Sequence, residues 1–387
     1  MYFKYKRWTL VVLATWLLTS ASLVLAQSIK IGVTLSATGP AASLGIPARQ
    51  AIALWPKEIA GQKLDVHVLD DASDPTGAVK NGRKLMIEDK VDVLVGSSTT
   101  PASLALIEIA AEAETPLITL AASARLVEPQ DAKRRWVFKV AANDSVMASA
   151  VVQHMSDKGV KTAAYIGFAD SYGESWLAEF KKFCDLKKIK IVAEESFGRS
   201  DTSVIAQVLK IMAARPDAVL VGAAGTPAVM PQASLGERGF KGLVYQTHGV
   251  GNNDFLRVGG DKVMGAYVPV GPSLVTEQLP ASHPLKTVTA DFVSRFEKVH
   301  GAGSRSLFAA QAYDVVLQLE QAIPKALKAA KPGSREFRLA LRDALEGIRQ
   351  LNANAGVFNF SPDDHAGLDQ NSRVMVQVVK SGWKLEP

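Results

Sequence analysis

Cysteine is nearly absent from this chain of 387 residues, which has a single one, Cys184. One cysteine excludes an internal disulfide and any redox or metal site built on a Cys-x-x-Cys pair. Cys184 falls within a helical pattern, where a lone cysteine is expected to be buried and to pack as a small apolar side chain. The fold must therefore be stabilised by its hydrophobic core, and a chain of this length is expected to form two domains.

The sequence also lacks the short motifs that mark the common enzyme and nucleotide sites. No Gly-x-Gly-x-x-Gly follows the first predicted strand, and there is no Gly-Lys-Ser/Thr phosphate loop, His-Glu-x-x-His or Gly-x-Ser-x-Gly. His365 stands among acidic residues near Pro362, and we predict a surface turn there rather than a metal or catalytic site. We therefore predict a protein that is not an enzyme, with no catalytic residue, no metal and no cofactor.

The charge balance excludes a nucleic-acid partner. Lys and Arg number 44 against 38 Asp and Glu, which gives a net charge of +6. Without the three basic residues among the first 26, the remaining chain carries only +3. The basic residues are not clustered with aromatic ones, as a nucleic-acid surface would require.

The N-terminus has the three parts of a secretory signal peptide. Lys4, Lys6 and Arg7 precede an uncharged, mostly apolar stretch that ends in small residues suited to cleavage after Ala26. Hydroxyl residues interrupt this stretch, whereas a retained membrane anchor would need about 20 apolar residues. We predict that residues 1–26 are removed, that the mature protein begins near Gln27, and that it is located in the periplasm.

Short buried strands alternate with helices along the rest of the chain. In the first half we predict strands at 29–35, 63–69, 91–95 and 116–120, and helices at 47–60, 77–89 and 101–114, the first kinked at Pro56. The alternation restarts with helices at 146–158, 174–186, 202–213 and 228–239 and strands at 162–167, 190–195, 218–221 and 243–246. Helices at 287–299, 307–327 and 335–347 and strands at 356–360 and 373–379 follow. Such alternation predicts an α/β fold with parallel sheets.

Small hydroxyl residues gather in the loops that follow three of the strands in the first half. These loops span residues 36–40, 96–101 and 121–124. In open α/β sheets, ligands bind beyond the carboxyl ends of the strands. Hydroxyls and free N–H groups at a helix N-terminus can bind a carboxylate without a fixed positive charge. Ser and Thr also cap helices, but three such loops at corresponding strand ends favour a ligand site.

Four segments resemble the periplasmic leucine/isoleucine/valine-binding proteins, which are type I solute-binding proteins of ABC importers. They are DDASDP at 70–75, GSSTTPAS at 96–103, PLIT at 116–119 and DSYGE at 170–174, and the resemblance covers the chain after the signal peptide. It implies two Rossmann-like lobes with parallel sheets, joined by three crossovers. Lobe 1 would comprise 27–141 and 271–369, and lobe 2 would comprise 142–270 and 370–387. The lobes would close on a small carboxylate ligand and deliver it, as a monomer, to an ABC permease of the inner membrane.

The resemblance also implies the ligand-binding residues. In this family the loops after the third and fourth strands bind the ligand carboxylate, an aromatic of lobe 2 covers the ligand, and further lobe 2 loops complete the site. The matching positions are Ser97, Ser98, Thr99, Ala121, Ser123, Tyr172, Ala224, Thr226 and His248.

Two departures from the family pattern bear on the ligand. Amino-acid-binding members carry an acid where His248 stands, and an aromatic where Ala224 stands. A histidine does not replace a carboxylate facing an ammonium group, and a smaller alanine leaves more room. The sequence leaves two ligand classes open, a branched-chain amino acid or an amino-free aromatic or aliphatic acid. It also leaves open a ligand-sensing receptor module of the same fold, while the missing nucleophile motif disfavours an exported hydrolase.

Overall fold

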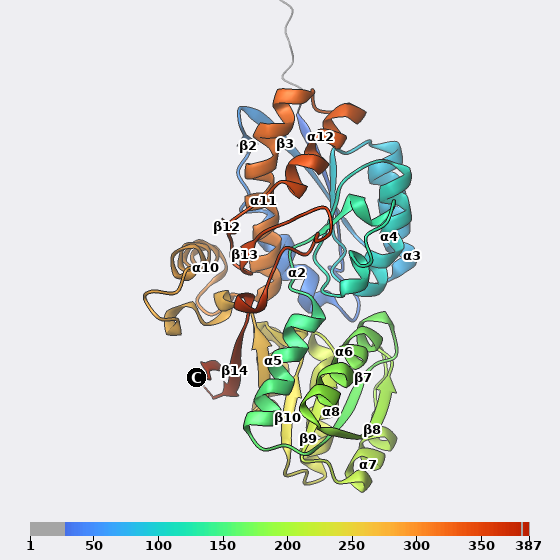
Figure 1. The fold of residues 1–387 in the computed structure, drawn as a ribbon, viewed down its shortest axis with the longest axis vertical. Coiled ribbons are helices and arrows are strands. Elements are labelled where there is room, and N and C mark those ends of the chain that lie inside the picture. Colours follow the sequence, from blue (N-terminus) through green and yellow to red (C-terminus); the bar gives the residue numbers. More distant parts are fainter. Residues whose placement is uncertain (1–27, 381, 387) are drawn as a thin grey trace, which may run out of the picture.

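The structure, a computed structural model, describes residues 28–380 and 382–386 and consists of two α/β lobes (Figure 1). The predicted signal peptide lies outside the described residues. Each lobe has one main sheet with helices against it. Within the described ranges, no helix is both long and apolar enough to span a bilayer.

The sheet of lobe 1 has six strands in the order β2-β3-β1-β4-β5-β6. The strands are β1 (Ile29–Leu35), β2 (Glu58–Ile59), β3 (Gln62–Asp70), β4 (Val93–Val95), β5 (Leu117–Thr119) and β6 (Val137–Lys139). All neighbours are parallel except β2 and β3. Ala60 and Gly61, with φ of 49° and 74°, form the two-residue turn of that hairpin.

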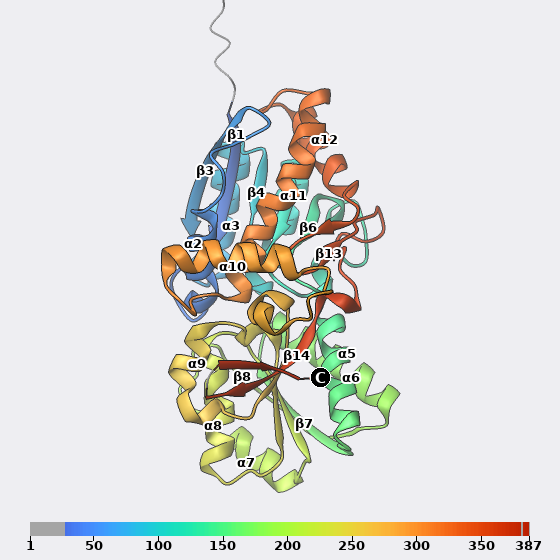
Figure 2. The same cartoon turned by 90° about the vertical axis from the view of Figure 1, so that its left-hand side faces the viewer.

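The helices of lobe 1 come from both ends of the chain. The N-terminal ones are α2 (Ala42–Ile52), α3 (Pro75–Gly82), which continues as a π-helical turn over Arg83–Glu88, and α4 (Thr100–Glu112). The C-terminal ones are α10 (Lys286–His300), α11 (Leu307–Ala329) and α12 (Arg335–Glu346). Helix α11 packs on α2 and α12, and its Val315, Val316 and Leu319 are fully buried (Figure 2). Lobe 1 is therefore completed by a segment far away in the sequence.

The sheet of lobe 2 has seven strands in the order β15-β14-β11-β10-β9-β7-β8. They are β7 (Thr162–Phe168), β8 (Lys190–Phe197), β9 (Ala218–Gly222), β10 (Leu243–Gln246), β11 (Tyr267–Val270), β14 (Val374–Val379) and β15 (Gly382–Leu385). The first five run parallel, whereas β14 and β15 are antiparallel additions at one edge. The helices are α5 (Asp144–Asp157), α6 (Ser171–Lys187), α7 (Ile205–Ala214), α8 (Val229–Glu237) and α9 (Asn253–Gly259).

The chain passes between the lobes three times. It crosses from β6 to α5, from β11 to the C-terminal helices of lobe 1, and back to β14 after a small hairpin of β12 (Leu351–Asn352) and β13 (Val357–Phe358) (Figure 1). These crossovers and the mostly parallel sheets confirm the predicted fold class. Cys184 is buried in α6, as expected.

One predicted helix differs from the structure in its bounds. The helix expected at 47–60 is α2, which begins five residues earlier, contains Pro47 and ends at Ile52, before Pro56. It lies so close to the end of β1 that a Cβ on Gly45 would overlap the Ser36 carbonyl, so this start depends on a tertiary contact.

The predicted surface turn is present at residues 361–364, where Pro362 and Asp363 are exposed, but His365 directly after it is fully buried. Its ring stacks on Phe138 at 4.2 Å between centroids, and its nitrogens lie 2.9 Å from the Val137 carbonyl oxygen and 3.1 Å from Glu346 Oε1. Burial lowers the pKa of His365. The polar residues around His365 predicted exposure, but the ring connects β6 with the end of α12.

Candidate ligand site between the lobes

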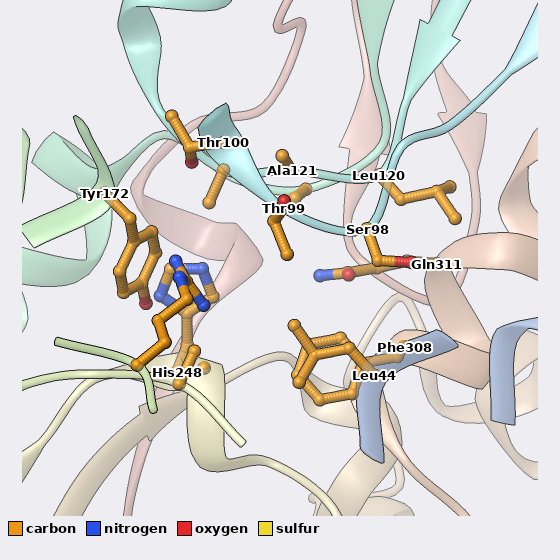
Figure 3. A pocket seen from close by; sticks show the side chains of 15 residues that line it. Leu44, Ser98, Thr99, Thr100, Leu120, Ala121, Tyr172, His248, Phe308 and Gln311 are labelled. Atoms are coloured by element: carbon orange, nitrogen blue, oxygen red, sulfur yellow. The ribbon is translucent and has the colours of Figure 1, made fainter. Parts of the chain in front are cut away.

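A small cavity lies between the lobes. Lobe 1 contributes α2, the loops after β4 and β5, and the first turn of α11, while lobe 2 contributes the start of α6 and the loops after β8, β9 and β10. Figure 3 shows side chains of both lobes pointing into this space. Its position at the carboxyl ends of the parallel strands of both lobes is that of a small-molecule site.

Six of the nine residues predicted to bind the ligand line this cavity: Ser98, Thr99, Ala121, Tyr172, Ala224 and His248. The other three, Ser97, Ser123 and Thr226, do not. Ser97 Oγ donates to Asp71 Oδ2 at 2.6 Å, and Ser123 Oγ lies 2.9 Å from Ser175 Oγ. Thr226 begins a short 3-10 helix and lines a separate surface hollow of lobe 2.

The lobe 1 end of the cavity is the N-terminus of α4. Gly96 has φ of 121°, and a Cβ there would overlap the Thr34 carbonyl, so only glycine allows this turn over β1. Ser98 Oγ accepts a hydrogen bond from the Ser36 N–H at 3.2 Å, which leaves the Ser98 hydroxyl proton free to donate. The buried Thr100 Oγ1 has no partner among the described residues. Free donors at a helix N-terminus favour an anion here.

The loop after β5 forms a wall rather than a set of donors. The Ala121 N–H, predicted to contact the carboxylate, already donates to Thr119 Oγ1 at 3.2 Å. Lys139 Nζ donates to the carbonyl oxygens of Ala122 and Ser123 behind the cavity. Ala121 therefore contributes an apolar surface.

Tyr172 presents its ring to the cavity from lobe 2 (Figure 3). Its hydroxyl donates to Thr247 Oγ1 at 2.8 Å, and the Thr247 hydroxyl in turn donates to the Ala223 carbonyl. Burial raises the pKa of Tyr172 well above its ordinary value, so the phenol is neutral. The ring is thus held in place for contact with an apolar ligand body.

His248 is neutral at physiological pH. Burial, reinforced by the charge of Lys139, lowers the pKa of His248 to about 3. Its Nδ1 has no hydrogen-bond partner among the described residues, and its ring lies 5.6 Å from that of Trp176. His248 therefore offers the ligand a hydrogen bond but no charge.

Arg199 is the cationic lining residue that the sequence patterns did not indicate. Its Nε donates to Asp170 Oδ2 at 2.6 Å, and its guanidinium carbon lies 4.1 Å from the centre of the Phe168 ring. Asp170 also accepts from the N–H groups of Tyr172 and Gly173 at the start of α6. The guanidinium is thus fixed from two sides. The available signal was the place of Arg199 two residues after β8, in a loop that also carries Ser200, Thr202 and Ser203, but the hydroxyl loops singled out in the sequence all lie in the first half of the chain.

The apolar part of the cavity comes from distant segments. Leu44 of α2, Leu120 and Phe308 of α11 line it, with Gln311 one turn further along α11 (Figure 3). Ser306 caps α11 by accepting from the Ala309 N–H at 3.0 Å, which fixes where this helix begins. Phe308 and Gln311 were missed because nothing local in the sequence connects α11 with the first sheet.

Comparisons with known proteins agree with this architecture. An extracellular ligand-binding receptor from Rhodopseudomonas palustris HaA2 is 46% identical with a TM-score of 0.90, and the match covers 93% of this chain and 100% of that one. The branched-chain amino acid transporter substrate-binding protein LivJ from Streptococcus pneumoniae is 21% identical with a TM-score of 0.77, covering 93% and 99%. A solute-binding protein of an ABC transporter from R. palustris is 19% identical with a TM-score of 0.76, covering 93% and 95%. The last two likenesses show the fold alone.

A search of curated proteins found no match. The sequence profile of a family described as periplasmic binding protein, Peripla_BP_6, matches residues 28–382. Among the described residues, no group of His, Cys, Asp and Glu is arranged to hold a metal ion. The profile match, the two-lobed fold and the interlobe cavity together show that the chain belongs to the periplasmic binding protein family, whose members bind solutes rather than act as enzymes.

Proposed function

We propose that this protein captures a small, amino-free organic carboxylate in the periplasm and delivers it to an ABC permease. The observation that carries this proposal is the charge of the cavity. Among the described residues that line it, none is Asp or Glu, and Arg199 is the cation. An α-ammonium group would lose its water without gaining an acidic partner, which is costly in a buried site. The neutral His248 does not supply that partner.

The carboxylate is assigned to the N-terminus of α4. Ser98, Thr99 and Thr100 meet there, and no acid among the described lining residues balances the partial positive charge of the helix end. The charge of Arg199 is already matched by Asp170. Its remaining guanidinium nitrogens suit a second acceptor, such as a hydroxyl or carbonyl, at the other end of the ligand. Replacing Ser98 removes a donor to a charged group, worth roughly 1.5–3 kcal/mol.

The ligand body is assigned to the space between the Tyr172 ring and the apolar side chains of Leu44, Leu120 and Phe308. A planar ring or a short branched chain matches these surfaces. Proteins of this fold take both ligand classes, since the LivJ structure is in complex with isoleucine and the R. palustris solute-binding protein is in complex with benzoate. The absence of a described lining acid favours the second class.

A thermal-shift screen of ligand-stripped protein tests the proposal. The panel holds leucine, isoleucine, valine, benzoate, 4-hydroxybenzoate, short aliphatic acids and keto acids. A ligand that binds only the native state stabilises it by about 2.7 kcal/mol at 100 times its Kd. We expect shifts with amino-free acids alone. A shift with the branched-chain amino acids would overturn the assignment and make this an amino-acid carrier.

A further inference from the structure

A chain of buried polar groups joins the two lobes beside the ligand cavity. Ser123, after β5 of lobe 1, lies 2.9 Å from Ser175 in α6 of lobe 2, measured between the Oγ atoms. Ser175 Oγ donates to Asp144 Oδ2 at 2.7 Å. Because a hydroxyl has one proton and that of Ser175 goes to Asp144, Ser123 must donate to Ser175. The direction of the chain, from lobe 1 to a carboxylate of lobe 2, is therefore determined.

Lys139 holds the lobe 1 end of this chain. Its Nζ donates to the carbonyl oxygens of Ala122 and Ser123 and to Asn143 Oδ1, and its side chain is fully buried. These bonds fix the orientation of the loop that carries Ser123. Burial lowers the pKa of Lys139 and raises the pKa of Asp144, and the opposite charge of each residue opposes the shift of the other. The cluster thus spans the first crossover, with Lys139 in β6 and Asp144 at the start of α5.

The lobes also contact each other at the protein surface, next to the hydrogen-bonded groups Ser123, Ser175 and Asp144. Arg125 of lobe 1 and Glu174 of lobe 2 form an ion pair of 3.3 Å, in which both side chains are more than half exposed. An exposed pair of this kind contributes little by itself. It does show that Ser123–Arg125 and Glu174–Ser175 face each other at two successive points.

We propose that the chain Ser123–Ser175–Asp144 is a closing contact that holds the lobes together without ligand. A contact made only in the closed form shifts the equilibrium toward that form by its differential free energy. Ser123, which the sequence placed on the ligand carboxylate, acts on lobe 2 instead. Through the loop it belongs to, it positions the wall around Ala121 in the closed cavity. The ligand then completes a closure that the protein itself already favours.

The test measures lobe separation in ligand-stripped protein by small-angle X-ray scattering. Ser123→Ala breaks the interlobe bond and leaves the bond from Ser175 to Asp144 intact, so it is the first variant. Ser175→Ala breaks the chain from the other side, and Ser175→Thr retains a hydroxyl. Ser234→Ala is the matched control, because the Ser234 hydroxyl contacts Arg238, next to α8 in the same lobe.

We expect a larger radius of gyration for both alanine variants at positions 123 and 175, with an open-to-closed ratio raised roughly two- to tenfold. Ser175→Thr and Ser234→Ala should match the wild type. Hydrogen exchange at residues 122–126 should accelerate in the two alanine variants, while exchange in β9 and β10 of lobe 2 stays unchanged.

Wild-type dimensions in Ser123→Ala and Ser175→Ala would overturn the proposal. So would equal expansion in Ser234→Ala, or exchange that accelerates throughout lobe 2, since both indicate general loosening. The measurement uses no ligand, so its failure and the failure of the ligand assignment are distinguishable.

Discussion

Ser97 and Ser98 are neighbours in the chain with opposite surroundings. Ser97 points into lobe 1, where Asp71 accepts hydrogen bonds from it and from Thr34 and Ser36. Ser98 lines the cavity and accepts from the Ser36 N–H. The two side chains leave the loop after β4 in different directions, so each meets different surroundings. Ser98 therefore faces the ligand cavity, whereas Ser97 contacts only lobe 1.

Ser98→Ala should weaken binding of the acid found in the thermal-shift screen by roughly 1.5–3 kcal/mol, because a charged acceptor loses a donor. It should also lower the free energy of unfolding by roughly 1–3 kcal/mol, because the buried Ser36 N–H loses its acceptor. Ser97→Ala should leave the affinity nearly unchanged and lower only the free energy of unfolding, by about 1–3 kcal/mol, because the buried Asp71 loses a donor. Isothermal titration and urea unfolding of both variants measure the two effects. Equal losses of affinity would contradict the assignment of Ser98.

His248 should make stability fall in acid. The pKa of His248 is about 3 in the folded protein, against about 6.5 in the unfolded chain. Between these values the unfolded chain binds a proton that the folded protein does not, so stability is lost as pH falls from 6.5 toward 3. From pH 7 to pH 5 this contributes a loss of roughly 2 kcal/mol. Urea unfolding at both pH values should show a smaller loss in His248→Gln, and an equal loss would show that His248 is accessible to protons.

At the scale of elements, the cleft closes where the loop after β9 meets α2. A Cβ on Gly225 would lie 2.7 Å from Ser43 Oγ and 2.9 Å from Leu44 Cδ1, both in the opposite lobe. The Ser43 hydroxyl is buried there without a partner among the described residues. Glycine at this position thus allows the lobes to approach each other.

The added Cβ of Gly225→Ala should clash with α2 and prevent full closure of the cleft. We expect weaker ligand binding and a larger radius of gyration in the presence of ligand. Gly239→Ala is the control, because Gly239 also has a positive φ but a Cβ added there would meet no atom within 4 Å. Both variants should lose some stability from backbone strain. If Gly225→Ala still closes and binds ligand tightly, the side chains of α2 move enough to accommodate the added Cβ.

At the scale of the whole molecule, the lobes are built unequally along the chain. Lobe 2 has five of its seven strands within residues 162–270, whereas lobe 1 needs α11, which follows these strands in the sequence. Without α11, apolar groups that now face Val315, Val316 and Leu319 would be exposed to water. Lobe 1 therefore completes its core only after most of the chain has been made.

Isolated fragments should show this difference. A fragment of residues 28–141 should fail to fold, while a fragment of residues 142–270 should retain a cooperative urea transition, because its parallel strands and helices are continuous in sequence. Circular dichroism during urea titration measures both. Cooperative unfolding of the 28–141 fragment would show that α11 and α12 are not required for the first sheet.

Sequence patterns alone were enough to predict the alternation of strands and helices, the two-lobed fold class and the hydroxyl loop at Ser98 and Thr99. These features depend on local patterns, namely short runs of apolar residues and the loops that follow them, and such patterns can be recognised from the sequence. The sequence resemblance also singled out His248, but the charge state of that residue follows from its burial.

The set of side chains that share the cavity depends on how the two lobes fold and meet. Arg199 and Phe308 come from segments far apart in the sequence, and Ser97 and Ser123 turn away from the cavity to bind Asp71 and Ser175. Side-chain direction at a loop and the meeting of distant segments depend on how two sheets and three crossovers pack. No local pattern records that packing, which is why residue types could indicate a ligand site while its members had to be found in space.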